Sequence, residues 1–387
     1  MKKRRIKKVA VLGSGIMGSR IACHFANIGV QVLLLDMVPR ELNETEASKG
    51  LTLEDNPVRN RIVNDSLQAA MKSNPSPVYS KSVVKLIETG NFDDDLPKIA
   101  ECDWVMEVIV ERLDIKQGLF ERVEEFRTPG TLITSNTSGI PIHLMNEGRS
   151  EDFRKHFCGT HFFNPPRYLR LLEIIPGSDT DPLVLDFLME YGKRFLGKTT
   201  VLCKDTPAFI ANRVGVFSIM WMFHYVKNNG WTVDEIDRLT GPMIGRPKSA
   251  TFRTTDVVGL DTLVHVANGL KDNVPNDEMK HLFEIPDYIQ HMVENKMLGS
   301  KTKQGFFKKV KGEDGKSEIL SLDLKTMEYG PRNRPKFPSV DMAKGEDDLG
   351  KRTKMLFNAK DKAGDFYRAH FANIMAYVTN RIPEISE

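Results

Sequence analysis

The chain has 387 residues, of which 40% are hydrophobic and 28% charged, and its formal net charge is +3. This length allows two sizeable domains and a tail, the composition is that of a globular protein, and no apolar run is long enough to cross a bilayer. The basic residues within 2–8 are interpreted as a solvated leader, since no apolar signal segment follows them. We therefore expect neither a membrane nor a nucleic acid as a partner.

The four cysteines lie far apart in the sequence and show no metal-ligand spacing. We expect them to be reduced and mostly buried, in a cytoplasmic protein without a metal site. They are Cys23, Cys102, Cys158 and Cys203.

The first part of the chain alternates apolar strands with amphipathic helices. A continuous apolar run at residues 8–13 predicts a strand buried on both faces, followed by a helix at about 15–28. Further strands are predicted at 32–36, 104–110 and 131–135, with helical sequence such as 116–127 between them. This order predicts an α/β fold with a Rossmann-type doubly wound sheet.

Two later segments change in character. Residues 41–90 are long and polar, and they predict a helical insert whose basic residues face solvent rather than a ligand. From about residue 204 the pattern becomes helical, as in 208–227 and 233–239, which predicts an all-α C-terminal domain. The basic residues of the insert are Lys49, Arg59, Arg61 and Lys72.

The domain boundaries follow from these changes of pattern. We expect a Rossmann-type domain at 1–203, a helical domain at 204–310, and a turn-rich linker or hairpin at 311–350. Residues 351–387 include a strong amphipathic helix at 363–387, and Asn380-Arg381 repeats the Asn212-Arg213 pair. We interpret this segment as the start of a second, truncated helical repeat.

A glycine loop joins the first predicted strand to the first helix. Gly13-Ser-Gly15-Ile-Met-Gly18 follows a buried strand, and Asp36 ends the next strand 18 residues after Gly18. Gly13 permits a tight turn, Gly15 lets the backbone approach a pyrophosphate, and Gly18 lets helix and strand pack closely. Because Asp36 would repel the 2′-phosphate of NADP, NAD is the preferred cofactor, although Arg40 lies close in sequence.

The candidate catalytic residues follow later strands. Ser135-Asn-Thr-Ser138 lies at a strand end, where a simple turn cluster is an equal alternative. His161 and Glu173 stand on two apolar strands joined by a short turn, so a hairpin can bring them together. A carboxylate beside an imidazole favours its protonated form and fixes its tautomer, as an acid/base pair requires. A packed core histidine is the alternative interpretation.

These motifs together resemble the L-3-hydroxyacyl-CoA dehydrogenase family over about residues 7–310. The resemblance is carried by the following motifs in this order: Gly13 to Gly18 with Asp36, Glu107-Val-Ile-Val-Glu111, Ser135-Asn-Thr-Ser138, His161-Phe-Phe-Asn-Pro165, Leu172-Glu173 and Cys203-Lys-Asp-Thr-Pro-Ala-Phe-Ile-Ala-Asn-Arg213.

The resemblance implies a set of roles. It implies oxidation of an L-3-hydroxyacyl-CoA with NAD, as in fatty-acid β-oxidation, by a homodimer. Residues 1–203 would then be the NAD-binding domain and residues 204–310 the substrate and dimerisation domain. His161 would take the hydroxyl proton while Glu173 orients it, and the supporting catalytic residues would be Ser138, Asn164 and Asn212. The implied cofactor-binding residues are Gly13, Gly15, Ile16, Met17, Gly18, Asp36, Glu111, Lys116 and Asn136.

The sequence departs from the family pattern in three places. Residues 245–256 are unusually basic, with Arg246, Lys248 and Arg253 interpreted as solvated surface rather than as CoA contacts. Pro165-Pro166 and Tyr168 are similar to the L-gulonate dehydrogenase and lambda-crystallin branch. The tail resembles long multifunctional members that also carry an enoyl-CoA hydratase module, so we expect a truncated piece of such a protein.

Two alternatives therefore stay open. One is an NAD-dependent dehydrogenase of a small free hydroxy acid such as L-gulonate. The other is a catalytically silent NAD-binding protein, which the presence of both His161 and Glu173 disfavours.

Overall fold

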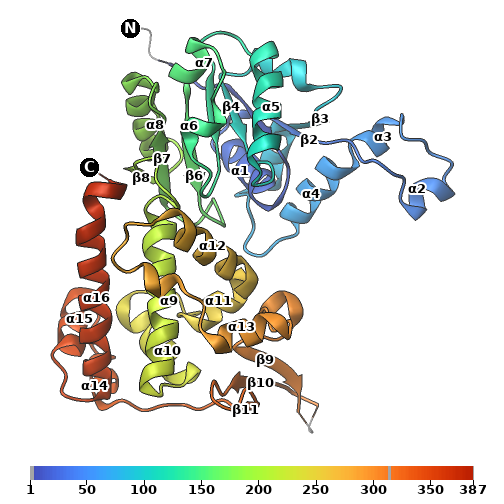
Figure 1. Ribbon diagram of the computed structural model, residues 1–387. Helices are drawn as coiled ribbons and strands as arrows, with labels where there is room; N and C mark the ends of the chain where they lie inside the picture. The colour runs from blue at the N-terminus through green and yellow to red at the C-terminus, as the bar shows by residue number, and fades with distance from the viewer. Residues whose placement is uncertain (1–3, 313–314, 387) are drawn as a thin grey trace. The chain divides into compact units, whose positions relative to one another are not determined.

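The computed structural model describes residues 4–312 and 315–386 (Figure 1). The chain forms two compact units, Met1–Ile210 with Pro383–Glu387, and Ala211–Ile382. Within the described ranges, none of the helices combines the length and the apolar character needed to span a bilayer.

The first unit is built on one eight-stranded sheet with the order β3-β2-β1-β4-β5-β6-β7-β8. Strands β1 to β6 run parallel, β7 is antiparallel to β6, and β8 runs parallel to β7. This arrangement confirms the Rossmann-type fold. The strands are β1 Lys8–Leu12, β2 Gln31–Asp36, β3 Ile87–Asn91, β4 Trp104–Glu107, β5 Leu132–Ser135, β6 Phe157–Phe162, β7 Leu171–Pro176 and β8 Thr199–Leu202.

Helices cover both faces of this sheet, because the central strand β1 is apolar on both faces from Val9 to Leu12. On β1, Val9 and Val11 pack into one core cluster while Ala10 and Leu12 pack into another. The helices are α1 Ile16–Asn27, α2 Glu44–Ser48, α3 Asn56–Arg59, α4 Arg61–Met71, α5 Leu113–Phe126, α6 Ile142–Met145, α7 Glu151–Lys155 and α8 Pro182–Arg194, with the 3-10 turns η1 Lys81–Leu86 and η2 Leu96–Glu101.

Two strands differ from the sequence-based expectation. The strand predicted at 104–110 ends at Glu107, because the amide of Ile109 donates to the Glu107 side chain instead of a neighbouring strand. At one edge of the sheet, β3 pairs with β2, and its short mixed sequence was not expected to form a strand.

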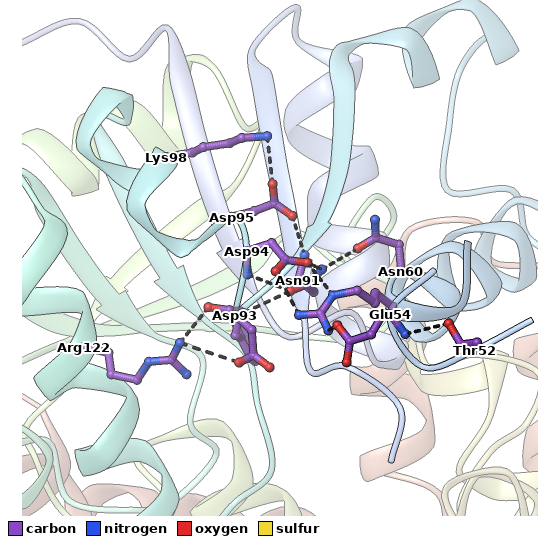
Figure 2. A network of polar contacts seen from close by, with 11 residues as sticks. Thr52, Glu54, Asn60, Asn91, Asp93, Asp94, Asp95, Lys98 and Arg122 are labelled. Carbon is purple, nitrogen blue, oxygen red and sulfur yellow. Dashed lines mark hydrogen bonds and ion pairs between the residues drawn. The ribbon is translucent and has the colours of Figure 1, made fainter. Parts of the chain in front are cut away.

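The insert predicted at 41–90 does contain helices, α2 to α4, and a polar network ties them to the sheet edge (Figure 2). Arg59 donates to Asp94 at 2.7 Å, and the Asn91 amide donates to both Asp94 and Asn60. Arg61 of α4 forms an ion pair with Glu46 of α2. These two arginines therefore hold the insert in place, whereas Lys49 and Lys72 are exposed.

The second unit is mainly helical and also holds a three-stranded antiparallel sheet with the order β11-β10-β9, where a linker or single hairpin was expected. Its strands are β9 Phe307–Lys311, β10 Ser317–Leu322 and β11 Tyr329–Pro331. Its helices are α9 Ala211–Asn229, α10 Val233–Leu239, α11 Phe252–Val258, α12 Leu260–Asn273, α13 Asp287–Glu294, α14 Pro338–Ala343, α15 Leu349–Phe357 and α16 Lys362–Ile385, with η3 Pro242–Ile244, η4 Lys280–Phe283 and η5 Ser300–Thr302.

The apolar pattern predicted that this helix begins at residue 208, but α9 begins at Ala211. The backbones of Ala208 and Phe209 have φ angles of 62° and 53°, and a right-handed helix cannot include such residues.

A buried ionic network joins α9 to the C-terminal helix α16 within the second unit. The Arg213 guanidinium is fully buried and donates to Asp277 and to the Tyr377 hydroxyl, both at 2.7 Å. Tyr377 also donates to Asp277 at 2.7 Å and stacks on Phe217. The repeated pair Asn380-Arg381 binds the next acid, Glu278. Arg213 and the Asn380-Arg381 pair thus bind two acids that are adjacent in the sequence, Asp277 and Glu278.

We predict that Asp277→Ala destabilises the chain strongly. The substitution leaves the Arg213 charge buried without its carboxylate, a change that typically costs about 3–5 kcal/mol. Urea unfolding of the variant and the parent measures this loss. The matched control is Asp287→Ala, because Asp287 is 94% exposed and pairs with Lys227 at the surface. Equal losses in the two variants would contradict the prediction.

Candidate active site

His161 and Glu173 form a buried pair on neighbouring strands. They are direct partners in the antiparallel register of β6 and β7, and Nδ1 of His161 lies 2.7 Å from Oε2 of Glu173. The His161 side chain is 5% exposed and the Glu173 side chain is fully buried. Because the carboxylate accepts the proton on Nδ1, the lone pair of the neutral ring lies on Nε2.

Aromatic rings and a strained segment surround this pair. Phe163 and Phe209 lie against the His161 ring, with centroid distances of 4.4 and 5.8 Å. The amide of Ile210 donates to the second oxygen of Glu173 at 3.2 Å. The left-handed backbone of Ala208 and Phe209 produces this placement, and each such residue costs of order 1–3 kcal/mol. Sequence reasoning missed Phe209, although it lies inside a motif that was singled out.

A second buried ionic cluster lies at the end of β4. Lys116 is 1% exposed, and its Nζ lies 2.7 Å from Glu107 and 3.3 Å from Glu111. Glu107 also accepts from the Ser135 hydroxyl and from the amide of Ile109. The cluster therefore joins the ends of β4 and β5 to the first turns of α5.

Glu111 holds the loop that carries Ser138. One of its oxygens accepts from the Thr137 hydroxyl at 2.6 Å and from the Ser138 amide at 2.8 Å. Burial alone would raise the pKa of Glu111, but Lys116 and these donors more than offset it and lower the pKa. Glu111 is therefore ionised at neutral pH and fixes the loop after β5.

Both candidate asparagines of the first unit have defined partners. The Asn136 side chain accepts from the amide of Phe162 at 2.9 Å and so ties the loop after β5 to the end of β6. Asn164 accepts from Arg20, on helix α1, at 2.9 Å. Arg20, Glu107 and Thr137 were not among the predicted site residues. Asn212 is the second residue of α9 and belongs to the second unit.

The glycine loop between β1 and α1 leaves no space for side chains at two of its glycines. A Cβ at Gly13 would lie 2.6 Å from the Val108 carbonyl oxygen, and one at Gly18 would lie 1.8 Å from that of Gly13. At Gly15 no atom lies within 4 Å of such a Cβ. The helix N-terminus has no side-chain cap, so its amides are suited to a phosphate.

The rest of the loop also fits a dinucleotide. Ile16, which is 68% exposed, and Met17 form the first turn of α1. The Asp36 carboxylate accepts from the amide and hydroxyl of Ser14 at 2.6 and 2.5 Å, which fixes it beside the loop. An acid fixed here can receive ribose hydroxyls and would repel a 2′-phosphate, as NAD rather than NADP requires.

We predict that two alanine substitutions in this loop affect different properties, the stability of the fold and the affinity for NAD. Gly18→Ala should destabilise the fold by about 1–3 kcal/mol or more, because the new methyl group overlaps the Gly13 backbone. Gly15→Ala should leave the unfolding midpoint unchanged but weaken NAD binding about tenfold or more, since its methyl group occupies the open face of the loop. Thermal unfolding and NADH fluorescence titration measure the two effects. Unchanged NAD affinity in a folded Gly15→Ala variant would contradict this assignment.

Comparisons with known proteins match both units. Residues 8–206 match the family described as 3-hydroxyacyl-CoA dehydrogenase, NAD binding domain, and residues 209–309 match its C-terminal domain. A probable 3-hydroxyacyl-CoA dehydrogenase of Bacillus subtilis is 46% identical over 99% of this chain and 48% of its own length. One of Deinococcus radiodurans is 45% identical over 80% of this chain and 84% of its own length.

A solved structure adds to these matches. The crystal structure of 3-hydroxybutyryl-CoA dehydrogenase from Escherichia coli is 26% identical, with a TM-score of 0.61, over 78% of this chain and 59% of that chain. The chain spans about half the length of the Bacillus subtilis relative. With an NAD-binding domain followed by the family's C-terminal domain, the chain belongs to the 3-hydroxyacyl-CoA dehydrogenase family.

Proposed function

We propose that this protein oxidises an L-3-hydroxyacyl-CoA to the 3-oxoacyl-CoA with NAD, as in fatty-acid β-oxidation. The observation that carries the proposal is the buried His161–Glu173 pair, with Nδ1 of the ring 2.7 Å from the carboxylate. Membership of the family supplies the reaction class, and the glycine loop with Asp36 fits the cofactor.

The two residues of the pair have different tasks. Bound NAD would accept the hydride from C3 of the substrate. His161 would take the hydroxyl proton at Nε2, because Nδ1 is occupied by Glu173. The buried carboxylate then stabilises the imidazolium and keeps the ring oriented, which a solvated carboxylate would do less well.

The remaining catalytic assignments are also proposals. Ser138 and Asn212 would hydrogen-bond the reacting oxygen or nearby substrate groups, and Asn164 would support the pair. Asn164 is supported by its bond to Arg20, which links it to the helix that follows the glycine loop. Ser138 is supported by the position that Glu111 gives to its backbone.

On the cofactor side, the contacts separate direct binding from positioning. We propose that Gly13, Gly15, Ile16, Met17, Gly18 and Asp36 form the dinucleotide site. Lys116 is fully buried between Glu107 and Glu111, and Asn136 is bound to the backbone of β6. For Glu111, Lys116 and Asn136 these contacts favour a positioning role on the nicotinamide side.

The proposal also covers the cellular setting and the assembly of the enzyme. We propose a cytoplasmic homodimer that works together with an enoyl-CoA hydratase module. All four cysteines are buried and unpaired, which suits a reducing compartment. The Bacillus subtilis relative is about twice as long as the matched region, which leaves room for further modules in such proteins.

We predict that His161→Gln lowers kcat for acetoacetyl-CoA reduction by about 10²–10⁴, because the amide cannot carry the proton. NAD affinity should stay nearly unchanged. The matched control is His156→Gln, since His156 precedes β6 at the opposite end of the strand and its Nδ1 lies 2.8 Å from the carbonyl oxygen and 3.4 Å from the carboxylate of Asp152. Stopped-flow and steady-state NADH absorbance give the rates. Normal turnover in the His161 variant would remove His161 as the base.

A second prediction concerns the substrate class. The enzyme should reduce acetoacetyl-CoA at least about a hundredfold more efficiently, in kcat/KM, than free acetoacetate, because binding of the CoA moiety contributes to the transition state. Tyr168 and Pro165-Pro166 favour the free-acid branch on similarity alone. A preference for acetoacetate or for gulonate oxidation would therefore establish that branch, and no NADH turnover with any of them would establish a silent NAD-binding protein.

A further inference from the structure

Two basic sequence stretches lie on one cavity of the second unit. The cavity measures about 1590 Å³, and all its lining residues fall between Asp234 and Lys344. Lys248 and Arg253 come from the unusually basic segment before and within α11, and Arg332, Arg334 and Lys336 come from the proline-flanked segment after β11. These stretches are about 80 residues apart in the sequence. The proposed function uses neither of them.

The charge of the cavity is strongly unbalanced. Nine Lys and Arg side chains line it, against four Asp and Glu side chains. Three of the four acids are occupied by the chain itself. Asp237 accepts from the backbone amides at the start of α11, Asp234 binds Arg332 and Ser321, and Asp341 binds Lys344 and Arg238.

Five of the basic side chains have no ion pair within the described residues. They are all exposed, so their charges face solvent rather than the core. They come from four different segments: the loop before α11, the residue after η5, strand β9, and the segment after β11. These five are Lys248, Lys303, Lys309, Arg334 and Lys336.

This arrangement selects a compact anion with several charges. Like charges held around a concave surface repel one another and concentrate positive potential, and a multivalent anion relieves both. Arg and Lys are the side chains that bind phosphate oxygens best. The cavity exceeds the roughly 300–1,000 Å³ of an ordinary ligand pocket, so it can also hold a body attached to the phosphates. Met243, Phe307 and Ile319 supply apolar lining for such a body.

We propose that this cavity binds a small molecule carrying two or more phosphate groups, such as a nucleoside polyphosphate or the phosphorylated end of a coenzyme. The site is formed by the second unit alone and shares no residue with the glycine loop of the first. An extended nucleic acid or an anionic membrane would favour a flat basic face over cations placed around a hollow. The proposal does not depend on the proposed dehydrogenase activity.

The test uses the full chain and inorganic tripolyphosphate, which has no base to occupy a dinucleotide site. Isothermal titration at fixed ionic strength compares the parent with the triple variant Lys248→Ala, Arg334→Ala and Lys336→Ala. We expect tripolyphosphate affinity to fall at least tenfold. The matched control removes the same charge from exposed positions outside the cavity, Lys351→Ala, Lys354→Ala and Lys360→Ala, and should retain parental affinity.

Further arms distinguish the ligand and the alternatives. Unfolding midpoints and NAD affinity equal to the parent confirm that both variants are folded. ADP and CoA, titrated with NAD saturating, identify which phosphorylated body the cavity prefers. Parental tripolyphosphate binding in the folded cavity variant, or an equal loss in the control, overturns the proposal. So does cavity-dependent binding of phosphatidylglycerol vesicles or of a polyglutamate peptide without binding of tripolyphosphate.

Discussion

The structure depends on the need of each buried carboxylate for a cationic or hydrogen-bonding partner. Glu107, Glu173 and Asp277 have fully buried side chains, and an uncompensated charge at such a place costs several kcal/mol. Each acid therefore fixes one partner: Lys116, His161 and Arg213 respectively. The same requirement that stabilises these partners also sets their orientation. On β6 and β7, this requirement also produces the geometry of an acid/base pair.

Much of the first unit could be predicted from its sequence, because burial on both faces of a parallel sheet leaves continuous apolar runs. The His161–Glu173 pairing was predictable for a related reason, since two apolar strands that are neighbours in the sequence were expected to form a hairpin. Strand β3 was not, because an edge strand needs few apolar residues. The left-handed backbone at Ala208 and Phe209 has no signal in residue type, so the start of α9 was misplaced.

The roles of several basic residues could not be predicted from the sequence. Arg59 and Arg61 in the insert were predicted to face solvent, yet Asp94 and Glu46 form ion pairs with them. Arg59 and Asp94 lie 35 residues apart, so no local pattern reveals the pair. Lys248 was interpreted as solvated surface, yet together with Lys336 it lines a cavity in which three of the four acids are already occupied. What decides the role of a cation is the partner that the fold brings to it.

The C-terminal helix illustrates the same rule at the level of a whole element. Tyr377 and Asp277 fix the Arg213 side chain, and Arg213 directly follows the candidate residue Asn212. The first turn of α9 is therefore positioned by groups from residues 64 and 164 further along the chain. Asn380 and Arg381 of α16 bind Glu278, just as Arg213 of α9 binds the adjacent acid Asp277. A substitution in α16 can therefore shift the position of Asn212 through the packing of α16 against α9. This effect requires no contact between α16 and a substrate.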